Sequence, residues 1–279
     1  MQKSAVIVVN SLVSRGSVGG RASVFVLERL GFPVISVPTR ILAWHPGHGP
    51  ATAINPDPAA FACLIGDLAG APWLGEVGAI VTGYFGDPSQ PEVAAGLVAA
   101  VRKANPAAVF LCDPIIGDGG RLFQPEATAR AIGAHLLPIA DIATPNRFEL
   151  GWFSGREPAD NSAMIAAARA LGPKEVVVTS AFGALGEIAN LAVTRDRVAR
   201  AAHAALPSVP HGTGDLIAAL YLAHRLGGRA PAEALERSAA AVLRLLRLAE
   251  KLGVDELPLA AGQEAFLAEP DGVTVSVGG

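Results

Sequence analysis

A single carboxylate stands among glycines directly before an apolar run of helical length. The segment reads Gly212-Thr213-Gly214-Asp215 and leads into "LIAALYLA". Unpaired backbone N–H groups and the helix dipole favour an anion at a helix N-terminus, so these residues predict an anion-binding site. In a phosphoryl transfer the amides would hold the transferred group, and Asp215 would accept the proton of the attacking hydroxyl group. A structural alternative stays open, in which Asp215 is a helix N-cap and the glycines form the turn before it.

Two further carboxylates lie close together in "CDPIIGDGGRLF". Asp113 follows an apolar run that predicts a strand, and Asp118 lies in the glycine-rich loop after it. Both could share one side of a site and hold a hydrated cation near phosphate oxygens. The alternative is that both are ordinary turn residues. Gly119 and Gly120 also make this loop a candidate flap over a ligand, to which Arg121 could add a hydrogen-bond donor.

Asn146 and Glu149 have the spacing of a capping box. In "TPNRFELG" a helix would begin after Asn146, with Glu149 at its third position, and this arrangement accounts for both residues. The same two side chains could instead orient the waters of a Mg2+ ion. From the spacing alone we favour the cap.

The loop "WHPGHG" carries His45 and His48 three residues apart. No third ligand of the right kind follows nearby, so we favour His45 as a wall or donor for an aromatic ligand over a metal site. Tyr84, in "GYFG" at the end of an apolar run, is either a packing residue or a polar ring tip that lines a pocket.

Short β-branched runs alternate with Ala- and Leu-rich stretches of helical length. The runs are continuously apolar, which is typical of strands covered on both faces, so the alternation predicts a parallel sheet wrapped in helices. Ligands of such sheets lie beyond the carboxyl ends of the strands, where polar residues such as Asn10, Ser11 and Thr39 occur. The predicted strands span residues 5–10, 33–39, 79–86, 108–114, 142–146 and 175–180, with one or two short edge strands in 181–208; the predicted helices span 19–31, 55–70, 89–104, 125–136, 159–171, 214–227 and 231–252.

Composition points to a compact domain with a small-molecule site. The 279 residues are 51% hydrophobic and contain no linker or repeat, so we expect one domain over residues 1–279. Cys63 and Cys112 match no metal spacing and are expected to be buried, reduced thiols. A net charge of -3 without a basic run argues against nucleic-acid or membrane partners, and no signal peptide or membrane span is evident, so we expect a cytoplasmic protein. Neither a P-loop nor a dinucleotide "GxGxxG" follows the first predicted strand.

Seven segments of the chain follow one another in the order and with the spacing found in a known enzyme family. The chain resembles the ribokinase-like superfamily of ATP-dependent small-molecule kinases and, within it, the pyridoxal kinase family. The resemblance implies an α/β fold, a three-layer α/β/α sandwich with a central mostly parallel sheet, which agrees with the predicted elements. The segments are "NSLVSRGSVGGRAS", "VPTRILAWHPGHG", "TGYFGDPSQ", "CDPIIGDGGRLFQPE", "LLPIADIATPNRFELGWFSG", "VVVTS" and "HGTGDLIAALYLA".

The resemblance also implies roles for individual residues. Asp215 would activate the 5'-hydroxyl of pyridoxal, with pyridoxine and pyridoxamine as further substrates, and Gly212, Thr213 and Gly214 would form the anion hole. ATP and Mg2+ would be the cofactors, with a monovalent cation such as K+ as an addition, and the chain would be a homodimer. The remaining positions form three groups: Ser11, Thr39, His45 and Tyr84 around the pyridine ring; Asp113, Asp118, Asn146, Glu149, Thr179 and Ser180 at the nucleotide; and Asp113, Asp118 and Glu149 at the metal, through water.

Several positions depart from the family pattern. Arg40 and Ile41 replace a typical Val-Gln pair, Ala43-Trp44 and Pro46 flank His45, and His211 stands where a small or apolar residue is commoner. These departures concern the substrate side of the site and leave the phosphoryl-transfer segment intact. Two alternatives follow: a kinase of another small alcohol such as hydroxymethylpyrimidine or a sugar, and a catalytically silent protein that binds a vitamer.

Overall fold

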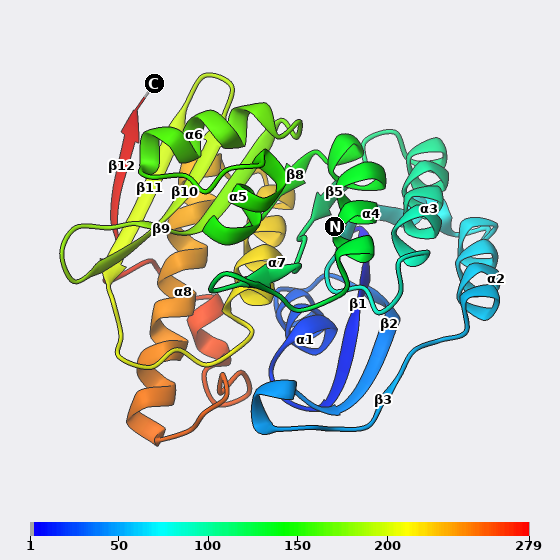
Figure 1. Cartoon of the computed structure of the whole chain (residues 1–279), viewed down its shortest axis with the longest axis horizontal. Coiled ribbons are helices and arrows are strands. Elements are labelled where there is room, and N and C mark those ends of the chain that lie inside the picture. Colours follow the sequence, from blue (N-terminus) through cyan, green and yellow to red (C-terminus); the bar gives the residue numbers. More distant parts are fainter. Residues whose placement is uncertain (1–2, 279) are drawn as a thin grey trace.

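The computed structural model describes residues 3–278. Ten strands form one sheet in the order β12-β11-β10-β9-β8-β5-β4-β1-β2-β3, and β6 and β7 form a separate hairpin (Figure 1). The strands are β1 (Ala5–Arg15), β2 (Val34–Trp44), β3 (Ala53–Ile54), β4 (Val77–Thr82), β5 (Val109–Cys112), β6 (Gly117–Asp118), β7 (Arg121–Leu122), β8 (Ile142–Ala143), β9 (Glu175–Phe182), β10 (Glu187–Thr194), β11 (Val198–Ala204) and β12 (Thr274–Gly278). The α-helices are α1 (Gly19–Arg29), α2 (Pro58–Ala69), α3 (Gln90–Ala104), α4 (Glu126–His135), α5 (Arg147–Ser154), α6 (Asn161–Ala170), α7 (Thr213–Leu226) and α8 (Pro231–Leu252).

The centre of the sheet is parallel and its two sides are antiparallel. Strands β2, β1, β4, β5, β8 and β9 pair in parallel, whereas β3 and β10 to β12 run antiparallel to their neighbours. The expected α/β fold with a mostly parallel central sheet between helices is therefore confirmed.

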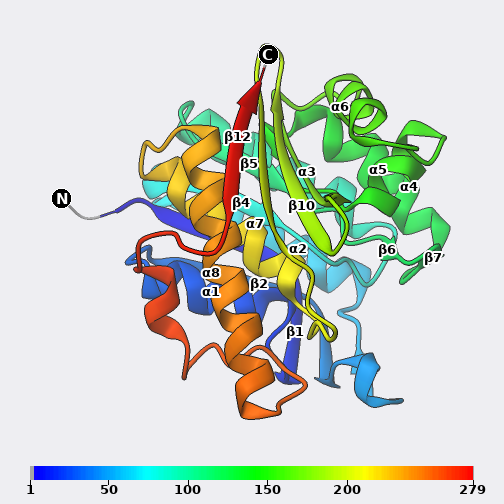
Figure 2. The same ribbon diagram turned by 90° about the vertical axis from the view of Figure 1, so that its left-hand side faces the viewer.

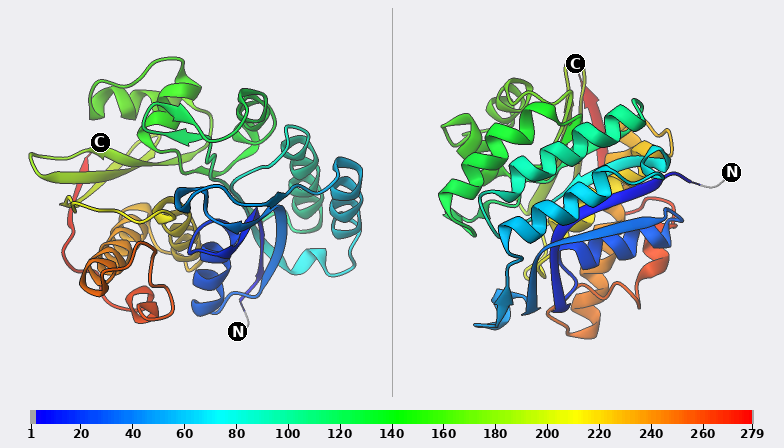
Figure 3. Two further views of the ribbon diagram at one scale, coloured as in Figure 1. Left: turned by 60° about the horizontal axis from the view of Figure 1, so that its bottom comes forward. Right: turned by 90° about the vertical axis from the view of Figure 1, so that its right-hand side faces the viewer.

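Helices cover both faces of the sheet, because successive side chains of its strands point to opposite sides. In β1, Val6 and Val8 pack into the core beneath α1, α7 and α8, and Ile7 and Val9 pack into the core beneath α2, α3 and α4. Helices α5 and α6 cover the same face further along, over β9 and β10. Figure 2 and Figure 3 show the resulting three layers from two sides. The continuously apolar strands of the sequence are explained by this double coverage.

Several predicted strand ends were wrong. β4, β5 and β8 end at Thr82, Cys112 and Ala143 rather than at residues 86, 114 and 146, and other strands run longer than predicted. β1 and β2 do not stop at residues 10 and 39 but continue to Arg15 and Trp44. Their pairing shifts register at a bulge between Asn10 and Leu12 and then resumes, while β4 ends at Thr82. A bulge bends a strand and re-aims its side chains without ending it, so the polar residues there look like a strand end in the sequence.

Three smaller expectations are corrected or extended. β10 and β11 exist where two short strands were expected, but β12 pairs with β11 and takes the edge position. Cys112 is buried, whereas Cys63 is exposed on α2, because only Phe61 and Ile65 of that helix are buried. No helix within residues 3–278 is both long and apolar enough to cross a bilayer.

Candidate active site

Helix α7 begins after a glycine in the left-handed conformation. Gly212 is the N-cap, with φ +94° and no side-chain cap, and a Cβ there would lie 2.4 Å from the Ser17 carbonyl oxygen. Only glycine tolerates this conformation and this contact. A Cβ on Gly214 would meet nothing within 4 Å, so the space beside this residue of the first helical turn is open. Helix N-terminal amides next to open space are suited to hold an anion.

Asp215 occupies the third position of α7, and 9% of its surface is exposed. The N-cap alternative for Asp215 is wrong, since Gly212 takes that position. Asn10 Nδ2 donates to Asp215 Oδ1 at 3.0 Å. Asn10 Oδ1 accepts the backbone N–H groups of Ser11 and Tyr84 at 2.7 and 2.9 Å, which leaves its amide nitrogen to face Asp215.

The environment of Asp215 controls its protonation. Burial raises its pKa above 3.8, and hydrogen bonds from the backbone N–H of Gly19, from Asn10 and from its own N–H oppose that rise. Desolvation is the largest of these effects. A carboxylate with a raised pKa and fixed donors is a suitable proton acceptor.

The residues expected around the pyridine ring gather in two groups. Ser11 and Thr39 are buried, Tyr84 is half-buried, and Thr39 Oγ1 donates to the Tyr84 carbonyl oxygen at 2.5 Å. Through Asn10 this group connects to Asp215. His45 belongs to a second group in the loop that follows β2.

His45 contacts His211, so a residue that matches the family pattern lies against one that departs from it. Their ring centroids are 4.3 Å apart with planes tilted by 35°, and a Cβ on Gly47 would lie 2.7 Å from His211 Nε2. Burial, followed by His211 and His48, lowers the pKa of His45 to about 4. His48 Nδ1 lies 3.4 Å from Asp255 and its Nε2 lies 3.1 Å from Glu256, so this histidine pairs with carboxylates.

Asn146 and Glu149 form the predicted capping box. Asn146 Oδ1 accepts from the Glu149 N–H at 2.9 Å, and Glu149 Oε2 accepts from the Asn146 N–H at 2.9 Å. Glu149 Oε1 also accepts the Ile116 N–H at 2.7 Å, and Asn146 Nδ2 donates to the Gly117 carbonyl oxygen at 2.8 Å. The cap therefore also anchors the hairpin β6–β7 that carries Asp118.

Two carboxylates of this region, Asp113 and Glu149, are buried and have raised pKa values. Burial, and then the charges of Glu149 and Asp215, raise the pKa of Asp113 well above 3.8, against a smaller effect of Thr144. Burial raises the pKa of Glu149 to about 7, although the N–H groups of Asn146, Gly117 and Ile116 oppose this. Repelling buried carboxylates are a setting in which a hydrated cation would be stabilised, so the donor set fits Mg2+. Among residues 3–278, no group of three His, Cys, Asp or Glu side chains is arranged so that it could bind a metal ion directly.

Thr179 and Ser180 lie next to the cap. Thr179 forms a parallel bridge with Asn146, and its N–H donates to the Pro145 carbonyl oxygen at 3.0 Å. Ser180 has φ +57°, an unfavourable value for a residue with a side chain, and such residues concentrate at functional sites. A cavity of about 600 Å³ borders this region and is lined by Asp118, Arg147 and Ser180 among others.

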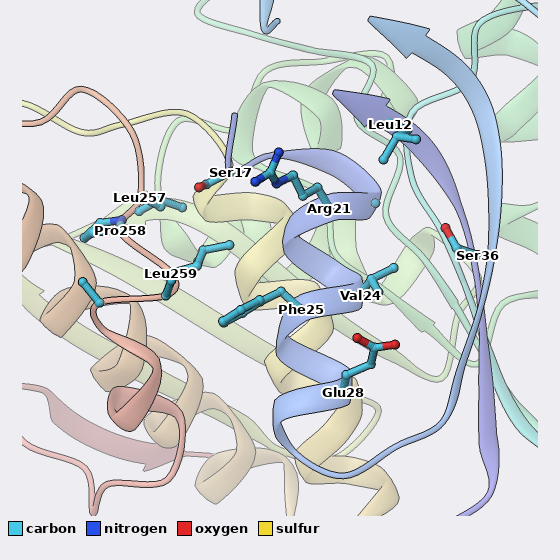
Figure 4. Close-up of a pocket in the computed structure, with 13 residues that line it drawn as sticks. Leu12, Ser17, Arg21, Val24, Phe25, Glu28, Ser36, Leu257, Pro258 and Leu259 are labelled. Atoms are coloured by element: carbon cyan, nitrogen blue, oxygen red, sulfur yellow. The ribbon is translucent and has the colours of Figure 1, made fainter. Parts of the chain in front are cut away.

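A second cavity of about 600 Å³ lies away from this chemistry. It is formed between α1 and the segment after α8, with Phe25, Arg21 and Leu259 in its walls (Figure 4). None of the predicted site residues lines it. The polar, buried network at the start of α7 remains the candidate active site.

From the sequence, Asn10 was noted only as a polar residue at a strand end, without a role in the site, and Gly19 was missed. A polar residue that interrupts the apolar run of β1 was the available signal for Asn10. Gly19 has φ +60°, and a Cβ there would lie 2.7 Å from Ser11 Oγ, but the sequence contains no sign that this glycine faces Asp215.

Comparisons with known proteins show which proteins this chain resembles. Residues 76–260 match the family model described as phosphomethylpyrimidine kinase. The chain is 39% identical over 274 residues to the pyridoxal kinase PdxY of Rubrobacter xylanophilus, which covers 94% of this chain and 93% of that protein. It is 34% identical to a pyridoxine/pyridoxal/pyridoxamine kinase of Bordetella bronchiseptica, over 91% of this chain and 93% of that one.

A solved structure shares the whole fold. The pyridoxal kinase of Leishmania donovani, in complex with ADP and pyridoxamine, superposes with a TM-score of 0.91 at 26% identity and covers 99% of both chains. The shared fold and the sequence similarity over more than 90% of the chain show that it belongs to the pyridoxal kinase family.

Proposed function

We propose that this chain transfers the γ-phosphoryl group of ATP to the 5'-hydroxyl of pyridoxal, a reaction of vitamin B6 salvage. Pyridoxine and pyridoxamine are further candidate substrates. The observation that carries the proposal is the buried Asp215, which Asn10 holds at the N-terminus of α7, where Gly214 borders open space. Similarity to pyridoxal kinases over the full chain supports the choice of alcohol.

The reaction proceeds as an in-line displacement. Asp215 accepts the proton of the 5'-hydroxyl group, and the oxygen forms a bond to the γ-phosphorus. The bond between that phosphorus and the β–γ bridging oxygen breaks, and ADP leaves with the electron pair. The N–H groups of Gly212, Thr213 and Gly214 stabilise the transferred oxygens through the helix terminus.

The nucleotide lies on the side of Asn146, Thr179 and Ser180, beneath the flap with Asp118. Mg2+ would be held through water by Asp113, Asp118 and Glu149, and it would supply positive charge near the phosphate oxygens. Ser11, Thr39, His45 and Tyr84 would surround the pyridine ring. The roles of Tyr84 and Thr39 are supported by the hydrogen bonds that connect them through Asn10 to Asp215.

We further propose that the chain acts as one domain and as a homodimer in the cytoplasm. The single ten-stranded sheet supports the first statement. The homodimer rests on the family resemblance and is tested by light scattering of the purified protein.

The test is an ADP-release assay with Mg2+ and ATP in which pyridoxal, pyridoxine, pyridoxamine and hydroxymethylpyrimidine are offered separately. We expect turnover of pyridoxal and a loss of about 10²–10⁴-fold in Asp215→Asn, because that variant lacks the proton acceptor. Turnover of hydroxymethylpyrimidine alone would show that the chain is a kinase of that alcohol and not of pyridoxal. Pyridoxal binding without ADP release from any substrate would select the silent binder.

A further inference from the structure

Arg40 is a cationic side chain within the polar network of the candidate site. It lies in β2 next to Thr39, and its Nη1 donates to Tyr84 Oη at 3.3 Å. The Tyr84 N–H donates to Asn10, which in turn donates to Asp215. Hydrogen bonds therefore connect the guanidinium group with the proposed proton acceptor through two intervening residues.

The guanidinium group lacks the partners that arginines normally have. Its Nε is buried and has no hydrogen-bond partner among residues 3–278, and within that range no carboxylate lies close enough to pair with Arg40. Arg102, Arg225 and Arg237, which are also partly buried, each pair with a carboxylate. A buried N–H group without a partner is unfavourable, so the environment of Arg40 is suited to an acceptor supplied by a ligand.

We propose that Arg40 is a specificity-determining residue that favours ring substituents with acceptor oxygens and disfavours an ammonium group. This inference rests on the proposed function. Arginine is permanently charged and has only donors, so it attracts carbonyl and phenolate oxygens and repels cations. Pyridoxal carries an aldehyde at the 4-position and pyridoxine a hydroxymethyl group, whereas pyridoxamine carries an aminomethyl group that is protonated near neutral pH. Repulsion of one competitor is a common source of specificity.

The expected order of kcat/KM is therefore pyridoxal first, pyridoxine next and pyridoxamine last.

The experiment measures kcat/KM for pyridoxal and for pyridoxamine in the wild type, Arg40→Gln and Arg40→Lys. Arg130→Gln is the matched control, because Arg130 is exposed on α4 and pairs there with Glu126. We expect a wild-type preference for pyridoxal of about 10-fold or more, a fall of at least 5-fold in that preference in Arg40→Gln, and retention in Arg40→Lys and in the control. The ratio is insensitive to a partial loss of folded enzyme, which lowers both values equally.

An unchanged ratio in Arg40→Gln, with pyridoxal still turned over, would overturn the role of Arg40 and leave the proposed function standing. If the wild type turned over no vitamer, the proposed function would fail. The same ratio would then be measured from equilibrium binding of pyridoxal and pyridoxamine, where equal preferences in wild type and Arg40→Gln would overturn the inference independently.

Discussion

Asn10 Nδ2 donates to Asp215 Oδ1 at 3.0 Å and so joins the bulge of β1 to the first turn of α7, 205 residues further along the chain. The side-chain oxygen of Asn10, Oδ1, already accepts hydrogen bonds from two backbone N–H groups. The amide can therefore face Asp215 in only one orientation, and it holds the carboxylate in place.

Replacing Asn10 with alanine should lower kcat because Asp215 loses the donor that orients it. We expect a fall of about 10–100-fold in kcat with little change in the KM for ATP, measured by ADP release. Asn105→Ala is the control, since Asn105 Nδ2 donates to the Val77 carbonyl oxygen far from Asp215. A loss of equal size in both variants would mean that the effect is one of stability.

The rate should depend on pH through Asp215. Burial raises its pKa, and the protonated carboxyl group cannot accept a proton, so activity should be present at high pH and fall as the pH falls through that raised pKa. The acid limb of the kcat/KM profile should therefore lie above pH 3.8, the ordinary value of an aspartate. A profile that is flat down to pH 4 in folded enzyme, checked by circular dichroism, would contradict this assignment.

Two glycines of the same turn should respond differently to alanine. Gly214→Ala places a methyl group in open space at a helical position, so folding should be unaffected or improved by up to about 1 kcal/mol, while kcat/KM for ATP should fall about 10–100-fold. Gly212→Ala should destabilise the fold by about 1–3 kcal/mol, because φ is +94° and the methyl group meets the Ser17 carbonyl oxygen. Urea unfolding and ADP release separate the two effects. Full activity in Gly214→Ala would argue against an anion at these amides.

His211 should affect substrate binding, because it packs against the loop that carries His45 and Gly47. His211→Val removes the ring that lies against His45 and Gly47, so the loop 45–49 should be less ordered and the KM for pyridoxal should rise about 3–10-fold with kcat nearly unchanged. The pKa of His45, lowered to about 4 in part by His211, should rise in this variant, which can be followed by NMR titration. His135→Val on α4 is a control. An unaltered His45 titration would mean that the two rings do not interact in solution.

Much of the architecture could be predicted from local patterns. The continuous apolar runs and the Ala- and Leu-rich stretches predicted the strands and helices because burial on both faces selects for them. The capping box at Asn146 and Glu149 was also predictable, since it depends only on contacts within four residues. The bulge at Asn10 and the long extensions of β1 and β2 were not, because pairing between strands decides where a strand ends.

The proposed catalytic segment was determined by the sequence itself: the glycines and Asp215 stand together before an apolar run, and a helix N-terminus is a local property. Only the tertiary structure brought Asn10 to Asp215, Arg40 to Tyr84 and His211 to His45. Each of these pairs joins segments that are far apart in the chain, and their contact depends on the order of strands in the sheet. That order follows from the packing of the whole core, which no short stretch of residues encodes.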